Sequence, residues 1–147
     1  MKTLITKTDY LSFLVCKKNF WLSKNKPELF EDSIPSDYEL KIIEEGNIVD
    51  TEIIKIFPEA QIISSFGNKS VEETNDLLNK KETILQSSFK HENFYIKADV
   101  IKYKPEKNEW DLYEVKSTTR VNKSKQGSHV DDITFQKLII EKTGIKI

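Results

Sequence analysis

Residues 93–117 read NFYIKADVIKYKPEKNEWDLYEVKS, and this stretch decides the fold class. Residues 93–103 and 110–117 are rich in β-branched and aromatic side chains, which favour β-strands. Between them, residues 104–108 contain the proline and asparagine that are typical of a turn. The stretch therefore predicts a β-hairpin.

Outward from the hairpin, hydrophobic periodicity and helix-capping residues predict the other elements. Helices are expected within residues 8–22, 38–57, 68–78 and 132–142, and further strands at 61–64 and 83–89. The strand at 83–89 extends the hairpin into a three-stranded meander. Together these elements predict an α+β or mixed α/β fold.

The length and composition of the chain indicate a single domain, residues 1–147. With 147 residues, of which 37% are hydrophobic, the chain can bury one moderate core. Its 23 basic and 24 acidic residues nearly cancel, so the net charge neither indicates nor excludes a nucleic-acid partner. The single cysteine, Cys16, excludes a disulfide framework and a four-thiolate metal site built from this chain alone. No apolar run is long enough for a signal peptide or a membrane span, so we expect a cytoplasmic protein without a membrane partner.

Asp99 and the triplet Glu114-Val115-Lys116 are the candidates for a functional site. Side chains alternate between the two faces of a strand, so we expect Glu114 and Lys116 on one face, with Asp99 near them across the hairpin. Two carboxylates suit Mg²⁺ or Mn²⁺, and the backbone carbonyl of Val115 would be a third ligand. Lys116 would position and activate a water molecule or stabilise charge on a phosphate. The pattern predicts metal-assisted phosphodiester cleavage.

An exposed ion pair would also explain Glu114 and Lys116. A Glu-x-Lys triplet arises by chance in a chain this rich in both residues, and Glu39-Leu40-Lys41 is a second copy. That copy lies in a helical pattern, and no strand acid precedes it. The metal-site interpretation therefore depends on Asp99 as well as on the triplet.

A further acid, Asp50, falls inside the apolar stripe that a helical wheel gives for residues 41–57. A carboxylate aimed at a core is costly unless it is paired or bound to a metal, so Asp50 is a candidate metal ligand. A structural hydrogen bond to a backbone amide would explain its position equally well.

Residues 116–129 form a basic segment that contains no acidic residue. Next to the proposed site, such a loop would contact phosphates without reading sequence. The expected nucleic-acid-binding residues are Ser117, Thr118, Arg120, Lys123 and Lys125. A solvated loop has the same composition, and both interpretations stay open.

Asp99 followed by Glu114-Val115-Lys116 resembles the motif of the PD-(D/E)XK nuclease superfamily, in particular its RecB-type and CRISPR-associated branches. The likeness is greatest to a bacterial branch described as a domain of unknown function. It covers nearly the whole chain, with supporting segments at residues 4–11, 16–22, 45–49, 98–100, 110–117 and 129–136. It implies a restriction-endonuclease-like core, in which helices flank a central mixed β-sheet with an antiparallel meander.

The resemblance implies roles for individual residues. Asp99 and Glu114 would be metal ligands, and Lys116 would be the catalytic lysine. Gln136 would lie near the active site or the substrate. Asp50 stands four positions after Gly46, where RecB-type relatives often have a metal-binding histidine.

The chain also departs from the family pattern. Relatives with an iron–sulfur cluster use four cysteines, of which only Cys16 is present, so no cluster is expected. The pattern normally continues past the last helix into another strand, so residues 1–147 are expected to be a truncated or minimal domain, and a further domain or protein partner is left open.

The implied function is that of a Mg²⁺- or Mn²⁺-dependent nuclease acting on DNA, with RNA left open and with repair, recombination or defence as its setting. The alternative is a nuclease-fold module with weak or no catalysis that binds nucleic acid or a protein partner.

Overall fold

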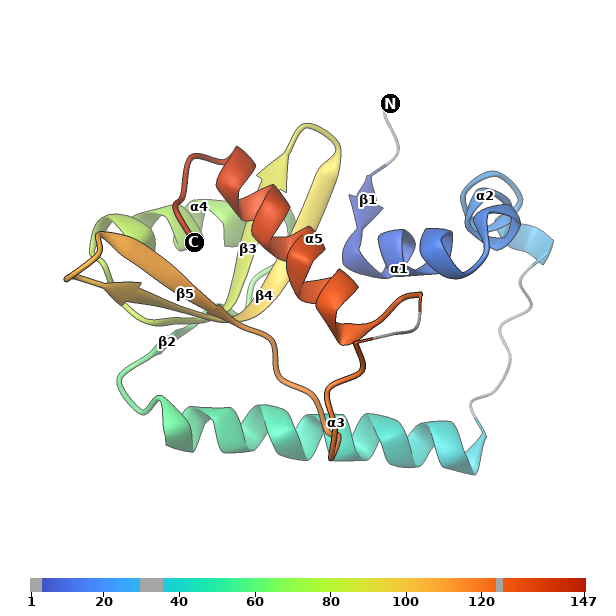
Figure 1. Cartoon of the computed structure of the whole chain (residues 1–147), viewed down its shortest axis with the longest axis horizontal. Coiled ribbons are helices and arrows are strands. Elements are labelled where there is room, and N and C mark those ends of the chain that lie inside the picture. Colours follow the sequence, from blue (N-terminus) through green and yellow to red (C-terminus); the bar gives the residue numbers. More distant parts are fainter. Residues whose placement is uncertain (1–3, 30–35, 124–125) are drawn as a thin grey trace.

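This computed structural model describes residues 4–29, 36–123 and 126–147. Over those residues the chain folds into a five-stranded mixed β-sheet flanked by helices (Figure 1). The expected mixed α/β class, with an antiparallel meander inside a mixed sheet, is confirmed.

The helices and strands follow the predicted order. The strands are β1 (Ile5–Thr6), β2 (Gln61–Ile62), β3 (Ile84–His91), β4 (Phe94–Lys104) and β5 (Glu109–Tyr113). The helices are α1 (Lys7–Val15), α2 (Lys17–Asn25), α3 (Asp37–Ile56), α4 (Gly67–Asn79) and α5 (His129–Lys142), with a 3₁₀ turn at Pro27–Leu29. Among the described elements, β1 and the short 3₁₀ turn have no predicted counterpart, because two or three residues are too few to carry a periodic pattern.

The sheet order places two strands on the same edge of β4. β3 pairs with β4 in an antiparallel ladder along one edge. The other edge is shared: β1 pairs in parallel with Phe94 and Tyr95, and β5 pairs antiparallel with the segment from Val100 to Lys104. Because their directions are opposite, the carboxyl ends of β1 and β5 point toward each other along β4.

The ladder between β3 and β4 is interrupted at Asp99. Leu85 pairs with Val100, but the next two opposed residues, Gln86 and Asp99, form no pair before the ladder resumes. Gln86 has a positive φ of 59°, which is uncommon for a residue with a side chain. Such an irregularity redirects the side chains around it and often lies beside a functional site.

The strand predicted through residue 117 is wrong at its end, because β5 stops at Tyr113. The next pair in the register would be Asp99 with Glu114. Instead, the Oδ2 atom of Asp99 accepts the N–H of Val115 at 2.7 Å, so a side chain replaces a ladder hydrogen bond. Strand alternation is therefore not what brings Glu114 and Lys116 together.

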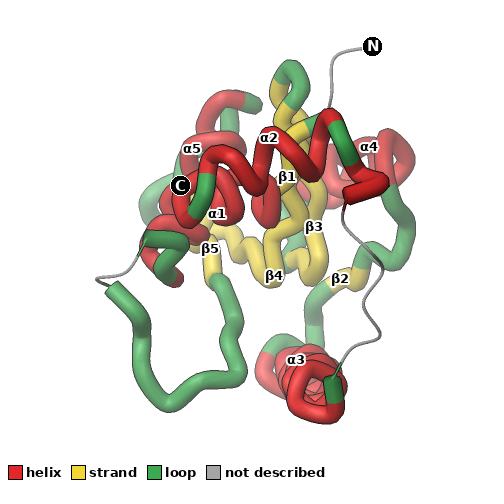
Figure 2. The backbone as a smooth tube through the Cα atoms, turned by 90° about the vertical axis from the view of Figure 1, so that its right-hand side faces the viewer, coloured by secondary structure: helices red, strands yellow, loops and turns green. Residues whose placement is uncertain are grey.

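The sheet lies between α5 and α1 on one side and α4 on the other (Figure 2). Phe135 of α5 stacks on Tyr10 of α1, with ring centroids 4.3 Å apart, and meets Phe94 of β4 edge-on at 6.0 Å. Ile139 and Ile140 continue this contact into the buried core. Phe135, Ile139 and Ile140 therefore hold α5 on the sheet, whereas Leu138, which belongs to the same predicted apolar pattern, is 51% exposed.

Helix α3 packs differently, because most of its large apolar side chains are exposed. Of the stripe predicted to face the core, Ile43 is 54% exposed and Ile56 is 69% exposed, whereas Ile53 is buried against Leu85 and Val100. The side chain of Asp50 is outside the described part of the structure. None of the described helices has the length and hydrophobicity needed to cross a membrane.

Candidate functional site

The candidate site lies where β1 and β5 end opposite each other along β4. Lys7 directly follows β1, and Glu114 directly follows β5. Their side chains meet with 2.9 Å between Lys7 Nζ and Glu114 Oε1. The converging strand ends thus join two residues that are far apart in the sequence.

Glu114 is the centre of this cluster, and its side chain is only 4% exposed. Its Oε1 atom also forms an ion pair with the ammonium group of Lys116, with 2.5 Å between Oε1 and Nζ. Its Oε2 atom accepts a hydrogen bond from Nε2 of Gln136, at 2.6 Å. Two cations and an amide therefore stabilise one buried carboxylate.

Helix α5 supplies Gln136 and a second buried acid, Asp132. A capping box between Ser128 and Asp131 sets the start of the helix. Asp132 and Gln136 are four residues apart and so share one helix face, where Gln136 Nε2 donates to Asp132 Oδ1 at 2.8 Å. Asp132 also lies 2.9 Å from the Nζ atom of Lys116 and 3.4 Å from that of Lys7.

The electrostatics of Asp132 and Lys116 are those of a tight ion pair. Burial alone would raise the pKa of Asp132, but hydrogen bonds from Lys116 and Gln136 and the charge of Lys7 hold it below its ordinary value. Burial alone would lower the pKa of Lys116, but hydrogen bonds to Glu114 and Asp132 raise it above its ordinary value. Both groups are therefore charged at neutral pH.

The negative charge of Asp99 is less well compensated than that of Asp132. Burial and then the negative charge of Glu114 raise the pKa of Asp99 from 3.8 to about 6, against the opposing effect of the Val115 N–H. Asp99 also lines a cavity of about 210 Å³ on the side of α3, together with Thr51 and Ile53. The structure thus places two carboxylates in electrostatic contact at the end of β5, one paired with lysines and the other not.

One polar atom in the cluster lacks a partner. The carbonyl oxygen Oε1 of Gln136 is buried and accepts no hydrogen bond from any described residue, although the Nε2 atom of the same amide donates to two carboxylates. The amide orientation follows from those carboxylates, which only accept hydrogen bonds. A buried acceptor without a donor is rare in a folded protein and needs an explanation.

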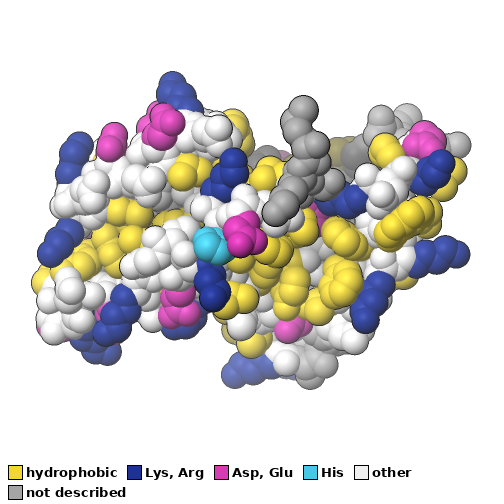
Figure 3. All heavy atoms as spheres, turned by 90° about the horizontal axis from the view of Figure 1, so that it is seen from above, with side chains coloured by type: hydrophobic (Ala, Val, Ile, Leu, Met, Phe, Trp, Pro, Cys, Tyr) yellow, Lys and Arg dark blue, Asp and Glu magenta, His cyan; other side chains and the backbone are white. Residues whose placement is uncertain are grey.

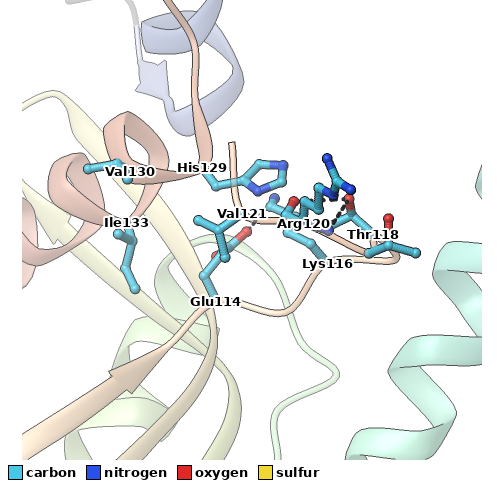
Figure 4. Close-up of a pocket in the computed structure, with 9 residues that line it drawn as sticks. Glu114, Lys116, Thr118, Arg120, Val121, His129, Val130 and Ile133 are labelled. Carbon is cyan, nitrogen blue, oxygen red and sulfur yellow. Dashed lines mark hydrogen bonds and ion pairs between the residues drawn. The ribbon is translucent and has the colours of Figure 1, made fainter. Parts of the chain in front are cut away.

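A cavity of about 360 Å³ opens beside Glu114 and Lys116 (Figure 4). Thr118 and Arg120, both expected to bind nucleic acid, line it. Ser117 and Lys123 are exposed but do not line it, and Lys125 is outside the described residues.

On one face of the molecule the positive charges are dispersed (Figure 3). On the face seen in Figure 3, lysine and arginine side chains stand apart from one another among acidic and apolar ones. This face offers no continuous basic stripe in its described part. The cavity beside Lys116 is therefore the better place to look for an anionic ligand.

The structure brings together Asp99, Glu114, Lys116 and Gln136 from the residues singled out in the sequence, and adds Lys7 and Asp132. Asp132 has a signal in the sequence, since it stands one helical turn before Gln136 on the same face. Lys7 has none, because its place depends on the pairing of β1 with a strand nearly ninety residues later.

The sequence matches no family model and no curated protein. The chemistry of the site must therefore be judged from its own atoms. These are the three carboxylates of Asp99, Glu114 and Asp132, two ammonium groups and an amide beside an open cavity, which is a set suited to binding a cation and a phosphate.

Proposed function

We propose that the chain is a metal-dependent nuclease that hydrolyses phosphodiester bonds in DNA. One observation carries the proposal: Asp99, Glu114, Lys116 and Gln136 are linked through hydrogen bonds, ion pairs and the charge of Glu114 acting on Asp99. These are the four residues to which the resemblance to PD-(D/E)XK nucleases assigns the chemistry.

The donor set fits Mg²⁺ or Mn²⁺. Asp99 and Glu114 would hold the ion with the carbonyl of Val115. A divalent cation would offset the burial and the repulsion from Glu114 that together raise the pKa of Asp99. The partnerless Oε1 of Gln136 adds a buried oxygen to the same cluster. No group of three acidic, histidine or cysteine side chains suited to a metal occurs in the described residues. The protein would thus supply part of the coordination sphere and water the rest, as is usual for Mg²⁺.

The ion would supply the electrophilic chemistry, by polarising the phosphate and lowering the pKa of a bound water. Lys116 would stabilise the negative charge that develops on the phosphate. Its raised pKa favours this role over that of a base, because a charged ammonium group cannot accept a proton. Asp132 would hold Lys116 in position through the contact of 2.9 Å.

The test is a cleavage assay on single- and double-stranded DNA and RNA with Mg²⁺ or Mn²⁺. We expect cleavage of DNA by the unchanged chain and a loss of at least about 100-fold in Glu114→Ala and in Lys116→Ala. Lys55→Ala, which removes an exposed lysine on α3, serves as the matched control and should cleave normally. Cleavage that persists in both site variants, or no cleavage of any substrate, would contradict the proposal.

A second candidate is a nuclease-fold module that binds nucleic acid or a protein partner without efficient catalysis. It is favoured by the complete pairing of Glu114, whose two oxygens already have Lys7, Lys116 and Gln136 as partners. An acid neutralised in this way can be purely structural. Binding of Mn²⁺ by calorimetry separates the two, since only the nuclease requires it, and Glu114→Gln should then abolish it.

A further inference from the structure

The cavity beside Glu114 and Lys116 has two chemically different sides (Figure 4). On the loop side lie the cations and hydroxyls of Lys116, Thr118 and Arg120. On the α5 side lie Val130 and Ile133, joined by Val121 from the loop. A ligand that fills this cavity needs an anionic end and an apolar end.

The polar side has one cation that the cluster does not use. Lys116 is held by Glu114 and Asp132, whereas the guanidinium of Arg120 forms no ion pair with any described residue. Thr118 fixes the backbone of Arg120, because its Oγ1 atom donates to the carbonyl of Arg120 at 3.2 Å and accepts its N–H at 3.4 Å. An arginine presented in this way is suited to a phosphate.

The apolar side is exposed although it is close to charged groups. Val121 is 61% exposed and Val130 is 41% exposed. Apolar surface inside a cavity with a few convergent polar groups is typical of ligand sites. The volume of about 360 Å³ lies near the lower end of the range for such sites and suits one small organic group.

The two sides are tied together before any ligand binds. The Nδ1 atom of His129, in the first turn of α5, accepts the backbone N–H of Asn122 at 3.2 Å. This hydrogen bond joins the loop to the helix at His129, which lines the cavity. The start of α5 is already capped by Ser128 and Asp131, so the phosphate is expected at Arg120 and not at the helix end.

We infer that this cavity binds one unpaired nucleotide, with its phosphate at Arg120 and its base against Val121, Val130 and Ile133. The inference rests on the proposed function, whose substrate it specifies as single-stranded nucleic acid. A base inside a duplex is stacked and paired and must leave the duplex before it can enter the cavity, so a blunt duplex is a poor ligand.

The test measures binding by fluorescence anisotropy, in EDTA so that cleavage does not interfere. The probes are a fluorescein-labelled oligothymidylate, a strand of the same length that contains only abasic sites, and a blunt duplex. The oligothymidylate should bind about tenfold more tightly than the abasic strand or the duplex, because only it offers a base to the cavity.

The variants separate the two ends of the cavity. Val130→Ser should weaken binding of oligothymidylate but not of the abasic strand, and Arg120→Ala should weaken binding of both. Leu138→Ser is the matched control, since Leu138 is 51% exposed on the same helix but does not line the cavity. Circular dichroism checks that all variants fold.

The inference is overturned if the abasic strand or the duplex binds as tightly as oligothymidylate, if none of them binds, or if Leu138→Ser has the effect of Val130→Ser. Its failure is distinguishable from that of the proposed function. Base-dependent binding without cleavage in Mg²⁺ or Mn²⁺ would support the cavity and reject the nuclease, and cleavage with base-independent binding would do the reverse.

Discussion

Helices α5 and α3 are both rich in large apolar side chains, but the fold buries them to very different extents. On α5, Phe135, Ile139 and Ile140 are buried, and the polar side chains of Asp132 and Gln136 are buried with them. On α3, which is longer, Ile43, Ile48 and Ile56 are more than half exposed. Apolar residues in a helical pattern therefore predict a helix, but they do not predict how much of that helix is buried against the rest of the protein.

Two acids of the candidate site, Asp132 on α5 and Asp99 on the α3 side, differ in a similar way. Asp132, on α5, is neutralised by two lysines, and its pKa is lowered. Asp99 lines the cavity on the α3 side, and its pKa is raised to about 6. The negative charge of Asp132 is therefore compensated by lysines, whereas Asp99 is a carboxylate that a bound cation would stabilise.

The largest expected difference between the helices is in core packing. Ile140→Ala removes a fully buried side chain of α5 and should lower the free energy of unfolding by about 3–4 kcal/mol. Ile43→Ala, its counterpart on α3, should change it by less than about 0.5 kcal/mol. Denaturant unfolding followed by circular dichroism measures both. Equal losses would mean that α3 is covered in solution.

The next largest effect on the free energy of unfolding is expected from the buried ion pairs of Asp132 on α5. Asp132→Asn leaves Lys116 and Lys7 with one fewer negative partner, and we expect a loss of about 3 kcal/mol in the free energy of unfolding. Glu52→Gln on α3 removes an exposed pair with Lys55 and should have almost no effect. A stable Asp132→Asn protein would show that the cluster is not a stabilising network.

The attachment of α3 can be tested through Ile53, by which the described part of the helix makes a buried contact with the sheet. Ile53→Ala should lower the free energy of unfolding by about 2 kcal/mol, because Ile53 packs against Leu85 and Val100. Hydrogen exchange should become faster in α3 and stay unchanged in α5. Faster exchange in both helices would show that they unfold as one unit.

The smallest effect concerns the charge of Asp99. Because its folded pKa of about 6 is above the ordinary 3.8, its contribution to stability is fully present below about pH 4 and is lost as the pH rises past 6. Asp99→Asn keeps an acceptor for Val115 and should raise the free energy of unfolding at pH 7 by about 1 kcal/mol. Unfolding curves at several pH values measure this. Asp99→Asn should also weaken Mn²⁺ binding, and unchanged affinity would remove Asp99 from the ligand set.

Much of the site could be predicted because it is local in sequence. Asp99, Glu114 and Lys116 belong to one hairpin, and a hairpin with a short turn brings its strands together whatever the rest of the chain does. The resemblance to PD-(D/E)XK nucleases added Gln136 to the residues expected at the site. The strand end was predicted poorly, since β propensity in residues 114–117 does not reveal that a carboxylate takes the place of a ladder bond.

The amino-acid sequence alone determined the meander, the helices and the hairpin acids, because β propensity, helical periodicity and turn residues act over a few neighbours. Only the tertiary structure decided that Lys7 meets Glu114, that Asp132 holds Lys116, and that α3 stays largely exposed. These features depend on which distant segments share the edge and the faces of β4. The sequence near each of these residues does not predict which distant segments pack together, because that depends on the packing of the whole core.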